Sequence, residues 1–244
     1  MKIIHSVLTK QSKVFGILLA STSLVLLLFV QWYDAGKKEM VVISTKYGDM
    51  TILLYEDTPI HKANFLKLAE ENFYDGLLFH RVISRFMVQG GDPNSKDAES
   101  NTRLGTGGPG YTIPAEINEY RIHKKGALAA ARQGDRVNPN RESSGSQFYI
   151  VQGKPLTPAE LEGIESRRNM QSPKEDDFEY SDKQIETYVE TGGTPHLDGA
   201  YTVFGEVVEG LDVIDSIATQ PVNAQSRPIT DIEMSMKIVK KKWP

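Results

Sequence analysis

The sequence of 244 residues contains no cysteine. This absence excludes disulfide frameworks, thiolate catalysis and cysteine-ligated zinc. The five histidines show no pairing at the spacing of helical zinc ligands, so the sequence predicts no metal site. An excess of positive charge is also absent, because 28 Lys and Arg stand against 32 Asp and Glu, with a formal net charge of −4. This balance argues against a nucleic-acid-binding protein that neutralises phosphates.

Cofactor-binding motifs are missing as well. Residues 105–110 (GTGGPG) match G-x-G-x-x-G in letters, but Tyr-Thr-Ile-Pro follows them instead of a helix, and Pro109 removes a donor. We interpret this segment as a turn. The sequence contains no P-loop and no G-x-S-x-G nucleophile elbow. We therefore expect no cofactor.

The N-terminal segment is typical of membrane targeting. Residues 14–30 form a run of 17 uncharged, mostly apolar residues, with Lys10 and Lys13 before it and Trp32 and Tyr33 after it. We predict that residues 1–33 are an uncleaved signal anchor with a transmembrane helix. A cleaved signal peptide is the main alternative, and a buried core helix is a weaker one.

The remainder of the chain is expected outside the cytoplasm. Lysines on the short N-terminal side of an apolar segment favour an orientation that places the rest of the protein on the far side of the membrane. The domain that follows would be anchored on the periplasmic side, or secreted or periplasmic if the segment is cleaved. We assign residues 34–39 to a linker and residues 40–244 to a single soluble domain.

The pattern after residue 40 indicates mainly β structure. Two apolar runs flank Gly48-Asp49, which suits a two-residue hairpin turn. Helices are expected to begin at Thr58-Pro59 and to span 211–218. The last strand alternates, with Ile232, Met234, Met236 and Ile238 on one face. Many strands with two helices predict a closed antiparallel barrel with helices over its ends.

An acidic stretch at about 155–194 does not fit this barrel. It contains two capping boxes, one from Thr157 to Glu160 and one from Ser181 to Gln184. We predict an insert of two short helices, and a disordered loop is the alternative.

One strand combines apolar and ionisable residues. In residues 79–83 (FHRVI), strict alternation would place Phe79, Arg81 and Ile83 on one face. By the same rule Gln147 and Tyr149 share a face. An arginine, two glutamines and large apolar side chains could therefore line one surface. The alternative is a core strand whose arginine extends to solvent.

Four ordered motifs resemble those of cyclophilins, the cyclosporin-binding class of peptidyl-prolyl cis-trans isomerases. They are FHRVISRFMVQGGD (79–92), GSQFYIV (145–151), HLDG (196–199) and VFGEVVEGLDVID (203–215). The resemblance covers about 41–240, interrupted by the insert. It implies an eight-stranded closed barrel capped by two helices, and an enzyme that needs no cofactor.

The resemblance also implies roles for individual residues. Arg81 matches the catalytic arginine of the family, and Gln89 matches the glutamine that orients it. Phe86, Met87 and Leu197 match the apolar wall that receives the proline ring. On this basis Arg81, Phe86 and Gln89 are the predicted catalytic residues.

Further positions are implied to bind substrate, some with departures from the family. Ala131 and Arg132 match the strand that pairs with substrate backbone, where many members have Ala-Asn. Gln147 matches the second glutamine of the site. Tyr149 replaces a common phenylalanine, and we expect it to add a hydroxyl to the pocket.

Two more substrate-binding positions differ from drug-sensitive members. His196 stands where those members have tryptophan, and Tyr201 where they have histidine. These changes argue against tight cyclosporin binding and leave Arg81 intact. We expect a monomeric isomerase that acts on proline-containing polypeptides and assists the folding of extracytoplasmic proteins. A non-catalytic proline-peptide binding module and a membrane-tethered scaffold are the alternatives.

Overall fold

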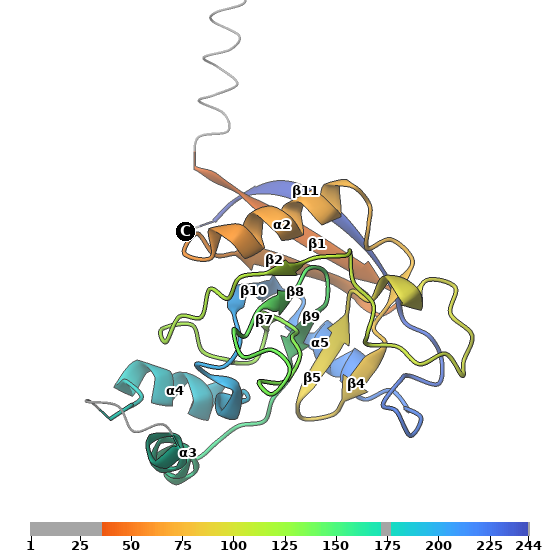
Figure 1. Cartoon of the computed structure of the whole chain (residues 1–244). Helices are drawn as coiled ribbons and strands as arrows, with labels where there is room; N and C mark the ends of the chain where they lie inside the picture. The colour runs from red at the N-terminus through yellow and green to blue at the C-terminus, as the bar shows by residue number, and fades with distance from the viewer. Residues whose placement is uncertain (1–35, 172–176, 244) are drawn as a thin grey trace, which may run out of the picture. The chain divides into compact units, whose positions relative to one another are not determined.

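The computed structural model describes residues 36–171 and 177–243 (Figure 1). The predicted signal segment 1–33 lies outside the described residues, as does the start of the predicted linker. In the part of the chain that the structure describes, no helix combines the length and the apolarity needed to cross a bilayer. The first strand begins at Lys37, so the end of the predicted linker is strand. Residues 39–239 form one compact unit.

The strands and helices follow one another in an order dominated by β structure. The strands are β1 (Lys37–Thr45), β2 (Gly48–Leu54), β3 (Leu77–Leu78), β4 (Arg81–Ile83), β5 (Met87–Gly90), β6 (Thr112–Ile113), β7 (Ala127–Ala130), β8 (Ser143–Ser144), β9 (Phe148–Val151), β10 (Val203–Glu209) and β11 (Glu233–Lys242). The α-helices are α2 (Pro59–Glu70), α3 (Pro158–Gln171), α4 (Asp182–Glu190) and α5 (Leu211–Ala218), and the 3₁₀ helices are η1 (Pro93–Ser95) and η2 (Pro195–Leu197).

Nine strands form one curled sheet in the order β3-β11-β1-β2-β10-β7-β9-β5-β4, and β6 pairs with β8 in a separate small sheet. The predicted closed eight-stranded barrel is therefore wrong in closure and in strand number. The edge strands β3 and β4 are consecutive in the chain but do not pair with each other. The main-chain N–H of Val82 in β4 instead donates to Ser226, at 2.8 Å. The sheet is an open half-barrel.

Local sequence signals account for most element boundaries. The alternation of β11 is confirmed, since Ile232, Met234 and Met236 are buried while the intervening residues are exposed. Helix α5 spans the predicted residues. The β1–β2 turn is Lys46-Tyr47 instead of the predicted Gly48-Asp49, because Thr45 pairs directly with Gly48.

The start of α2 shows how a distant residue completes a helix. Pro59 occupies the first turn as predicted, but the side chain of Thr58 makes no capping hydrogen bond. The carboxylate of Glu116 accepts hydrogen bonds from the N–H groups of Ile60 and His61, at 3.1 and 2.9 Å. A carboxylate at this end satisfies free donors and complements the helix dipole.

The curled sheet separates two apolar clusters. Val82, Val88, Ile150 and Leu128 belong to the main core, to which α2 and α5 also contribute. Their neighbours along the same strands, such as Met87, Tyr149 and Val151, form a second cluster on the opposite face. This division follows from the alternation of side chains along strands. The candidate site lies on the second face.

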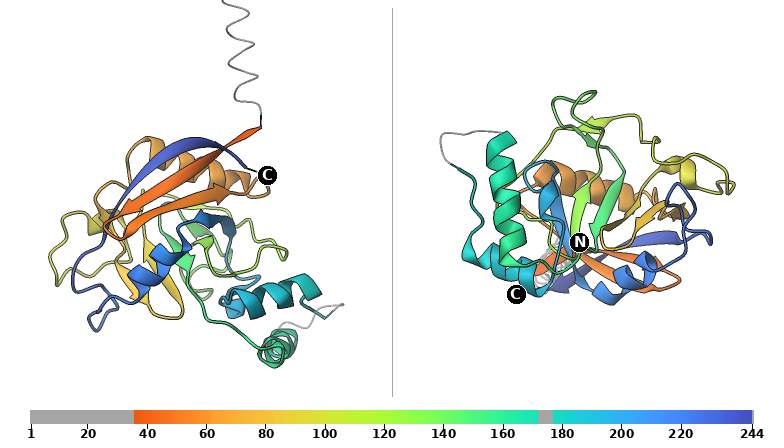
Figure 2. Two further views of the ribbon diagram at one scale, coloured as in Figure 1. Left: turned by 180° about the vertical axis from the view of Figure 1, so that it is seen from behind. Right: turned by 90° about the horizontal axis from the view of Figure 1, so that it is seen from below.

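The predicted helical insert is present. Helices α3 and α4, teal in Figure 2, lie beside each other. Both predicted capping boxes form: the Thr157 N–H donates to Glu160 at 2.8 Å, and Ser181 and Gln184 exchange hydrogen bonds. A small core of its own contains Ile122, Leu156, Leu161, Tyr180 and Tyr188. This core joins the insert to the rest of the domain through Ile122.

Candidate active site

A small pocket of about 150 Å³ opens on the face opposite the main core. Its lining is Arg81, Phe86, Met87, Gln89, Ala131, Arg132, Tyr149, Leu197 and Tyr201. All nine belong to the eleven predicted site residues. We call this site the small pocket. Ligand pockets for drug-sized molecules measure about 300–1,000 Å³, so this pocket suits a single side chain.

The pairing of the strands brings these residues together. Arg81 in β4 lies opposite Gln89 in β5, Gln89 lies opposite Tyr149 in β9, and Tyr149 lies opposite Ala129 in β7. Residues directly opposite each other in antiparallel strands share a face. One row across four strands thus carries a guanidinium, an amide and an aromatic ring to the same side of the sheet.

The polar side of the site is a chain of hydrogen bonds. Arg81 donates from Nη1 to Oε1 of Gln89 at 3.0 Å. Gln89 donates from Nε2 to Oε1 of Gln147 at 3.0 Å, and Gln147 donates to the carbonyl of Gly107 at 2.7 Å. Because each amide donates onward, the Oε1 atom of Gln89 is directed at Arg81. The chain therefore fixes the position of the guanidinium.

The surroundings of Arg81 differ from the prediction in one respect. Alternation across residues 79–83 would place Phe79 and Arg81 on one face, yet Phe79 is fully buried in the main core and Arg81 is exposed. The reason is that β3 ends at Leu78 and β4 begins at Arg81, so the residues between them are not strand. Arg81 and Ile83 alone keep the predicted shared face.

The apolar side of the small pocket comes from β5, β9 and the segment after the insert. Met87 is 1% exposed and Tyr149 5% exposed, and the ring of Tyr201 stands edge-on to that of Tyr149 at 5.9 Å. Phe86 and Leu197 pack against the same cluster. These groups present aliphatic, aromatic and thioether surface to the pocket, whose edge carries the guanidinium of Arg81.

Two predicted residues lie next to the small pocket without lining it. Gln147 lines a neighbouring cavity of about 770 Å³, which also contains Gln89 and Arg132. His196 in η2 stacks on Phe86, with 5.6 Å between ring centroids and 27° between planes. Burial is the main cause that lowers the pKa of His196 below its usual value.

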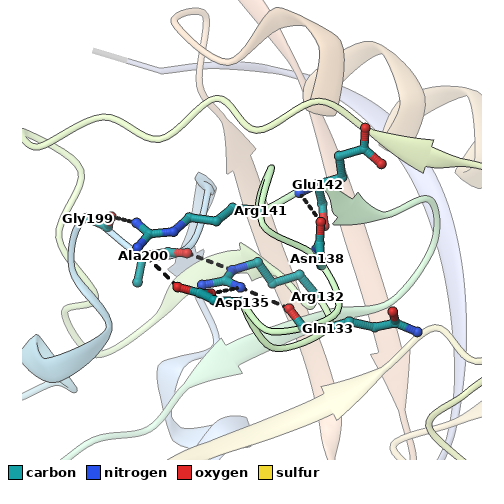
Figure 3. Close-up of polar contacts among 8 residues, drawn as sticks. All are labelled: Arg132, Gln133, Asp135, Asn138, Arg141, Glu142, Gly199 and Ala200. Atoms are coloured by element: carbon teal, nitrogen blue, oxygen red, sulfur yellow. Dashed lines mark hydrogen bonds and ion pairs between the residues drawn. The ribbon is translucent and has the colours of Figure 1, made fainter.

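Arg132 uses its guanidinium inside the protein (Figure 3). Its Nε donates to the carbonyl of Ala200 at 2.8 Å, and its Nη1 donates to Gln133 and to Asp135 at 2.9 and 2.6 Å. The guanidinium also stacks over the ring of Tyr201 at 4.5 Å. These contacts hold the side chain away from free interaction with a ligand.

Arg141, a second arginine of the loop 132–142, also connects this loop to the segment that contains Gly199 and Ala200. Arg141 donates to the carbonyl of Gly199 at 3.1 Å and to Asp135 at 3.1 Å (Figure 3). Asn138 donates to the carbonyl of Glu142 and accepts from its N–H. Hydrogen bonding from Arg132 is the main cause that lowers the pKa of Asp135. These contacts fix the loop 132–142, which lines the neighbouring cavity and reaches the small pocket at Arg132.

The hydroxyl of Tyr149 points into the protein, which corrects the expectation that it adds a polar group to the pocket. It lies 3.0 Å from Nε2 of His123, and Nδ1 of His123 lies 2.7 Å from Oδ1 of Asp198. Asp198 also accepts from the hydroxyls of Tyr180 and Tyr188, at 2.9 and 2.5 Å. Burial raises the pKa of Tyr149 well above its usual value.

This buried network contains residues that the sequence did not single out. Asp198 lies within the HLDG motif, but nothing in its neighbours identifies its partners. His123 is an isolated histidine in a loop, and its role depends on contacts with β9 and with the residues after the insert. Tyr180 and Tyr188 connect the insert to the wall of the small pocket through Asp198 and His123.

Comparison with known proteins gives consistent results. The sequence profile of the cyclophilin type peptidyl-prolyl cis-trans isomerase/CLD family matches residues 40–238. A Staphylococcus saprophyticus protein, provisionally named a peptidyl-prolyl cis-trans isomerase, is 35% identical over 209 residues, with coverage of 84% of this chain and 93% of the relative. A Streptococcus pyogenes protein, provisionally named a bifunctional phosphatase/peptidyl-prolyl cis-trans isomerase, is 39% identical over 200 residues, which are 79% of this chain. The matched region spans only 37% of that Streptococcus protein.

A solved structure supports the fold. The crystal structure of a cyclophilin type peptidyl-prolyl cis-trans isomerase from Cryptosporidium parvum, determined in the presence of the dipeptide Ala-Pro, superposes with a TM-score of 0.56. It is 23% identical and covers 82% of this chain and 98% of its own.

Proposed function

Because the chain belongs to the cyclophilin-type peptidyl-prolyl cis-trans isomerase family, we propose that it catalyses rotation about X–Pro bonds at the small pocket. The observation that carries the proposal is the Arg81–Gln89–Gln147 chain at the rim of an apolar pocket the size of one side chain. The substrates would be proline-containing polypeptides.

The reaction requires no bond cleavage. Resonance in the amide gives a rotation barrier of about 18–20 kcal/mol, and uncatalysed exchange at proline takes about 10–100 s. Twisting the bond interrupts resonance and localises a lone pair on the prolyl nitrogen. A group that binds the twisted state better than either planar state lowers the barrier.

Arg81 has the donors for this task. A guanidinium carries five N–H groups, and the bond to Gln89 occupies Nη1. Nε and Nη2 remain to donate to the prolyl nitrogen as its lone pair develops. A hydrogen bond to a charged group contributes about 1.5–3 kcal/mol, which corresponds to about 10- to 100-fold in rate.

The apolar wall supplies a second contribution. A planar amide is more dipolar than a twisted one, so a drier environment favours the twisted form. Phe86, Met87, Tyr149 and Leu197 provide that environment, and a bound proline would cover the exposed Arg81. Arginine suits this position because it keeps its charge when substrate removes water from it.

Substrate backbone would pair with Arg132. The N–H of Ala131 already donates to Gln147, and its carbonyl accepts from Ser144. In the described part of the chain no hydrogen bond is recorded for the main-chain N–H and C=O of Arg132. Since the guanidinium of Arg132 is held by Ala200 and Asp135, its backbone is the part that faces substrate.

The test is exchange NMR on an Ala-Pro peptide with the full chain. Arg81→Ala should lower the isomerisation rate by one to three decades with an unchanged thermal unfolding midpoint. Arg103→Ala, which removes an exposed arginine that does not line the small pocket, is the matched control. Peptide binding without isomerisation in the unmodified protein would instead identify a binding module. Full activity of Arg81→Ala would remove the proposed mechanism.

We propose further that the protein acts outside the cytoplasm as a membrane-anchored monomer that assists folding. The support comes from the sequence of residues 1–33, where Lys10 and Lys13 precede the apolar run. N-terminal sequencing of the mature protein distinguishes retention from cleavage. Protease added to spheroplasts, whose inner membrane is intact and whose outer envelope is open, should digest the domain if it lies outside the cytoplasm, and protection of the domain would contradict this location.

A further inference from the structure

A second concave surface adjoins the small pocket. It has a volume of about 680 Å³ and lies between the β4–β5 turn, η2 and helix α3. Its lining includes Arg85, Phe86, Lys154, Gly163, Arg167 and His196. We call it the insert groove. A single proline needs only the small pocket, so the insert groove is additional binding space.

The insert groove is continuous with the small pocket. Phe86 lines both of them, and His196 stacks on the groove side of that ring. A polypeptide with its proline in the small pocket can therefore extend past Phe86 into the groove. The cavity beside Gln147 shares Gln89, Ala131 and Arg132, not Phe86, with the small pocket, so it would serve another part of the substrate.

The wall of the groove formed by α3 is shaped for occupation. Ala159, Gly163 and Arg167 follow one another at intervals of four residues, so they share a helix face. A Cβ atom at Gly163 would meet no heavy atom within 4 Å. Together with Leu156 and Ile164, the small residues Ala159 and Gly163 give the groove an open apolar surface.

The charge of the groove is opposite to that of the whole chain. Its lining contains three cations, Arg85, Lys154 and Arg167, and one acid, Glu160. Lys154 and Glu160 pair at 2.6 Å, and this hydrogen bond is the main cause that lowers the pKa of Glu160 to about 2. Within the described residues no ion pair is recorded for Arg85 or Arg167. Two positive charges thus remain available in a protein with a net charge of −4.

The backbone at Arg85 supports a functional reason for its position. Its φ angle is 61°, which is uncommon for a residue other than glycine. The main-chain N–H donates to Gln152 and holds this conformation. Residues kept in such conformations cluster at functional sites.

We propose that the insert groove binds the substrate segment next to the proline and selects acidic and apolar residues there. The proposal deepens the proposed function, since it rests on proline occupying the small pocket. The occupant is the arm of the client polypeptide that leaves the small pocket past Phe86. Arg85 and Arg167 would attract its carboxylates, while Leu156, Gly163 and Ile164 would receive an apolar side chain.

The experiment compares labelled peptides by fluorescence polarisation with the full chain. Each peptide has a central Ala-Pro flanked by alanines, with Leu-Glu-Glu, Leu-Gln-Gln or Leu-Lys-Lys placed before the proline in one series and after it in another. In one of the two series the acidic peptide should bind tightest. Each arginine should contribute about two- to fivefold, as exposed ion pairs do.

Three variants make the test specific. Arg85→Gln and Arg167→Gln should each remove about two- to fivefold of the preference for the acidic peptide. Lys183→Gln removes the same charge from an exposed position in α4 outside the groove, and it should leave the preference unchanged. Gly163→Leu fills the open space while raising helix propensity. It should weaken the flanked peptides and leave an unflanked Ala-Pro peptide unaffected.

Equal binding of acidic and basic peptides in both series would overturn the proposal. Equal effects of Arg167→Gln and Lys183→Gln on the preference for the acidic peptide would also overturn it. Isomerisation of the unflanked peptide, measured separately by exchange NMR, tests the proposed function. If that rate is absent while the acidic preference persists and depends on Arg167, the groove stands and the isomerase assignment falls. If the rate is present without a charge preference, the groove proposal falls alone.

Discussion

Removing the hydroxyl of Tyr149 should destabilise the domain, although the aromatic ring that lines the small pocket is kept. The carboxylate of Asp198 accepts a hydrogen bond from Nδ1 of His123. This nitrogen therefore carries the ring proton, and Nε2 is left as an acceptor. Tyr149 is therefore the donor to Nε2, at 3.0 Å. The His123 side chain is 0% exposed, so no solvent replaces the donor in Tyr149→Phe.

The magnitude follows from the burial of the acceptor. A hydrogen bond contributes about 0.5–1.5 kcal/mol net, but a buried partner left unsatisfied costs about 1–3 kcal/mol. We expect Tyr149→Phe to lower the free energy of unfolding by about 1–3 kcal/mol. For a domain of about 150–250 residues, the melting temperature should fall by about 2–4 °C per kcal/mol.

Urea denaturation with a matched variant checks this reasoning. Tyr201 packs edge-on against Tyr149, and in the described part of the chain no hydrogen bond is recorded for its hydroxyl. Tyr201→Phe removes the same atom and should change stability by less than about 0.5 kcal/mol. If the two variants lose the same stability, the Tyr149–His123 hydrogen bond contributes nothing and the reasoning is refuted.

Three further predictions concern the site, the core and the insert. Gln89→Leu removes the acceptor of Arg81, so kcat/KM for an Ala-Pro peptide should fall about tenfold by exchange NMR; an unchanged value would show that Gln89 does not orient Arg81. Burial lowers the pKa of His80 to about 4 in the fold, against about 6.5 in the unfolded chain, so stability should decrease as pH falls through this interval and level off below it. His80→Phe should remove about 2–3 kcal/mol of the difference between urea curves at about pH 7 and about pH 4.5, and an unaltered pH dependence would contradict this. Asp198→Ala leaves several buried donors unpaired and should cost about 3 kcal/mol or more, with faster limited proteolysis of the insert; an equally resistant insert would argue against this anchor.

Elements set by local signals could be predicted well from the sequence. The alternation of β11, the boundaries of α5 and the two capping boxes of the insert depend on neighbouring residues, and the structure confirms them. Closure of the barrel depends on whether two distant edges meet, and the sequence carries no local signal for that. The break between β3 and β4 also lacked a local signal. It places Phe79 and Arg81 on different sides of the sheet, which alternation alone did not predict.

The candidate site was predictable in membership and less so in orientation. Motif resemblance named the nine residues of the small pocket, and the pairing of β4, β5 and β9 carries Arg81, Gln89 and Tyr149 to one face. It could not show that the Tyr149 hydroxyl turns to His123, or that the Arg132 guanidinium is held by Ala200 and Asp135. Those orientations depend on partners far away in the chain.

The anchoring of the insert through Tyr180, Tyr188 and Asp198 has a consequence for protein engineering. A chimera that exchanges residues between Lys154 and Thr194 for a short loop would remove two tyrosine donors from a carboxylate that stays in the rest of the domain. Loss of activity in such a chimera would reflect destabilisation by Asp198, whose Oδ2 atom loses these donors, and it would not show that the insert selects substrates. A clean transplant, in either direction, has to move Asp198 and His123 together with the helices.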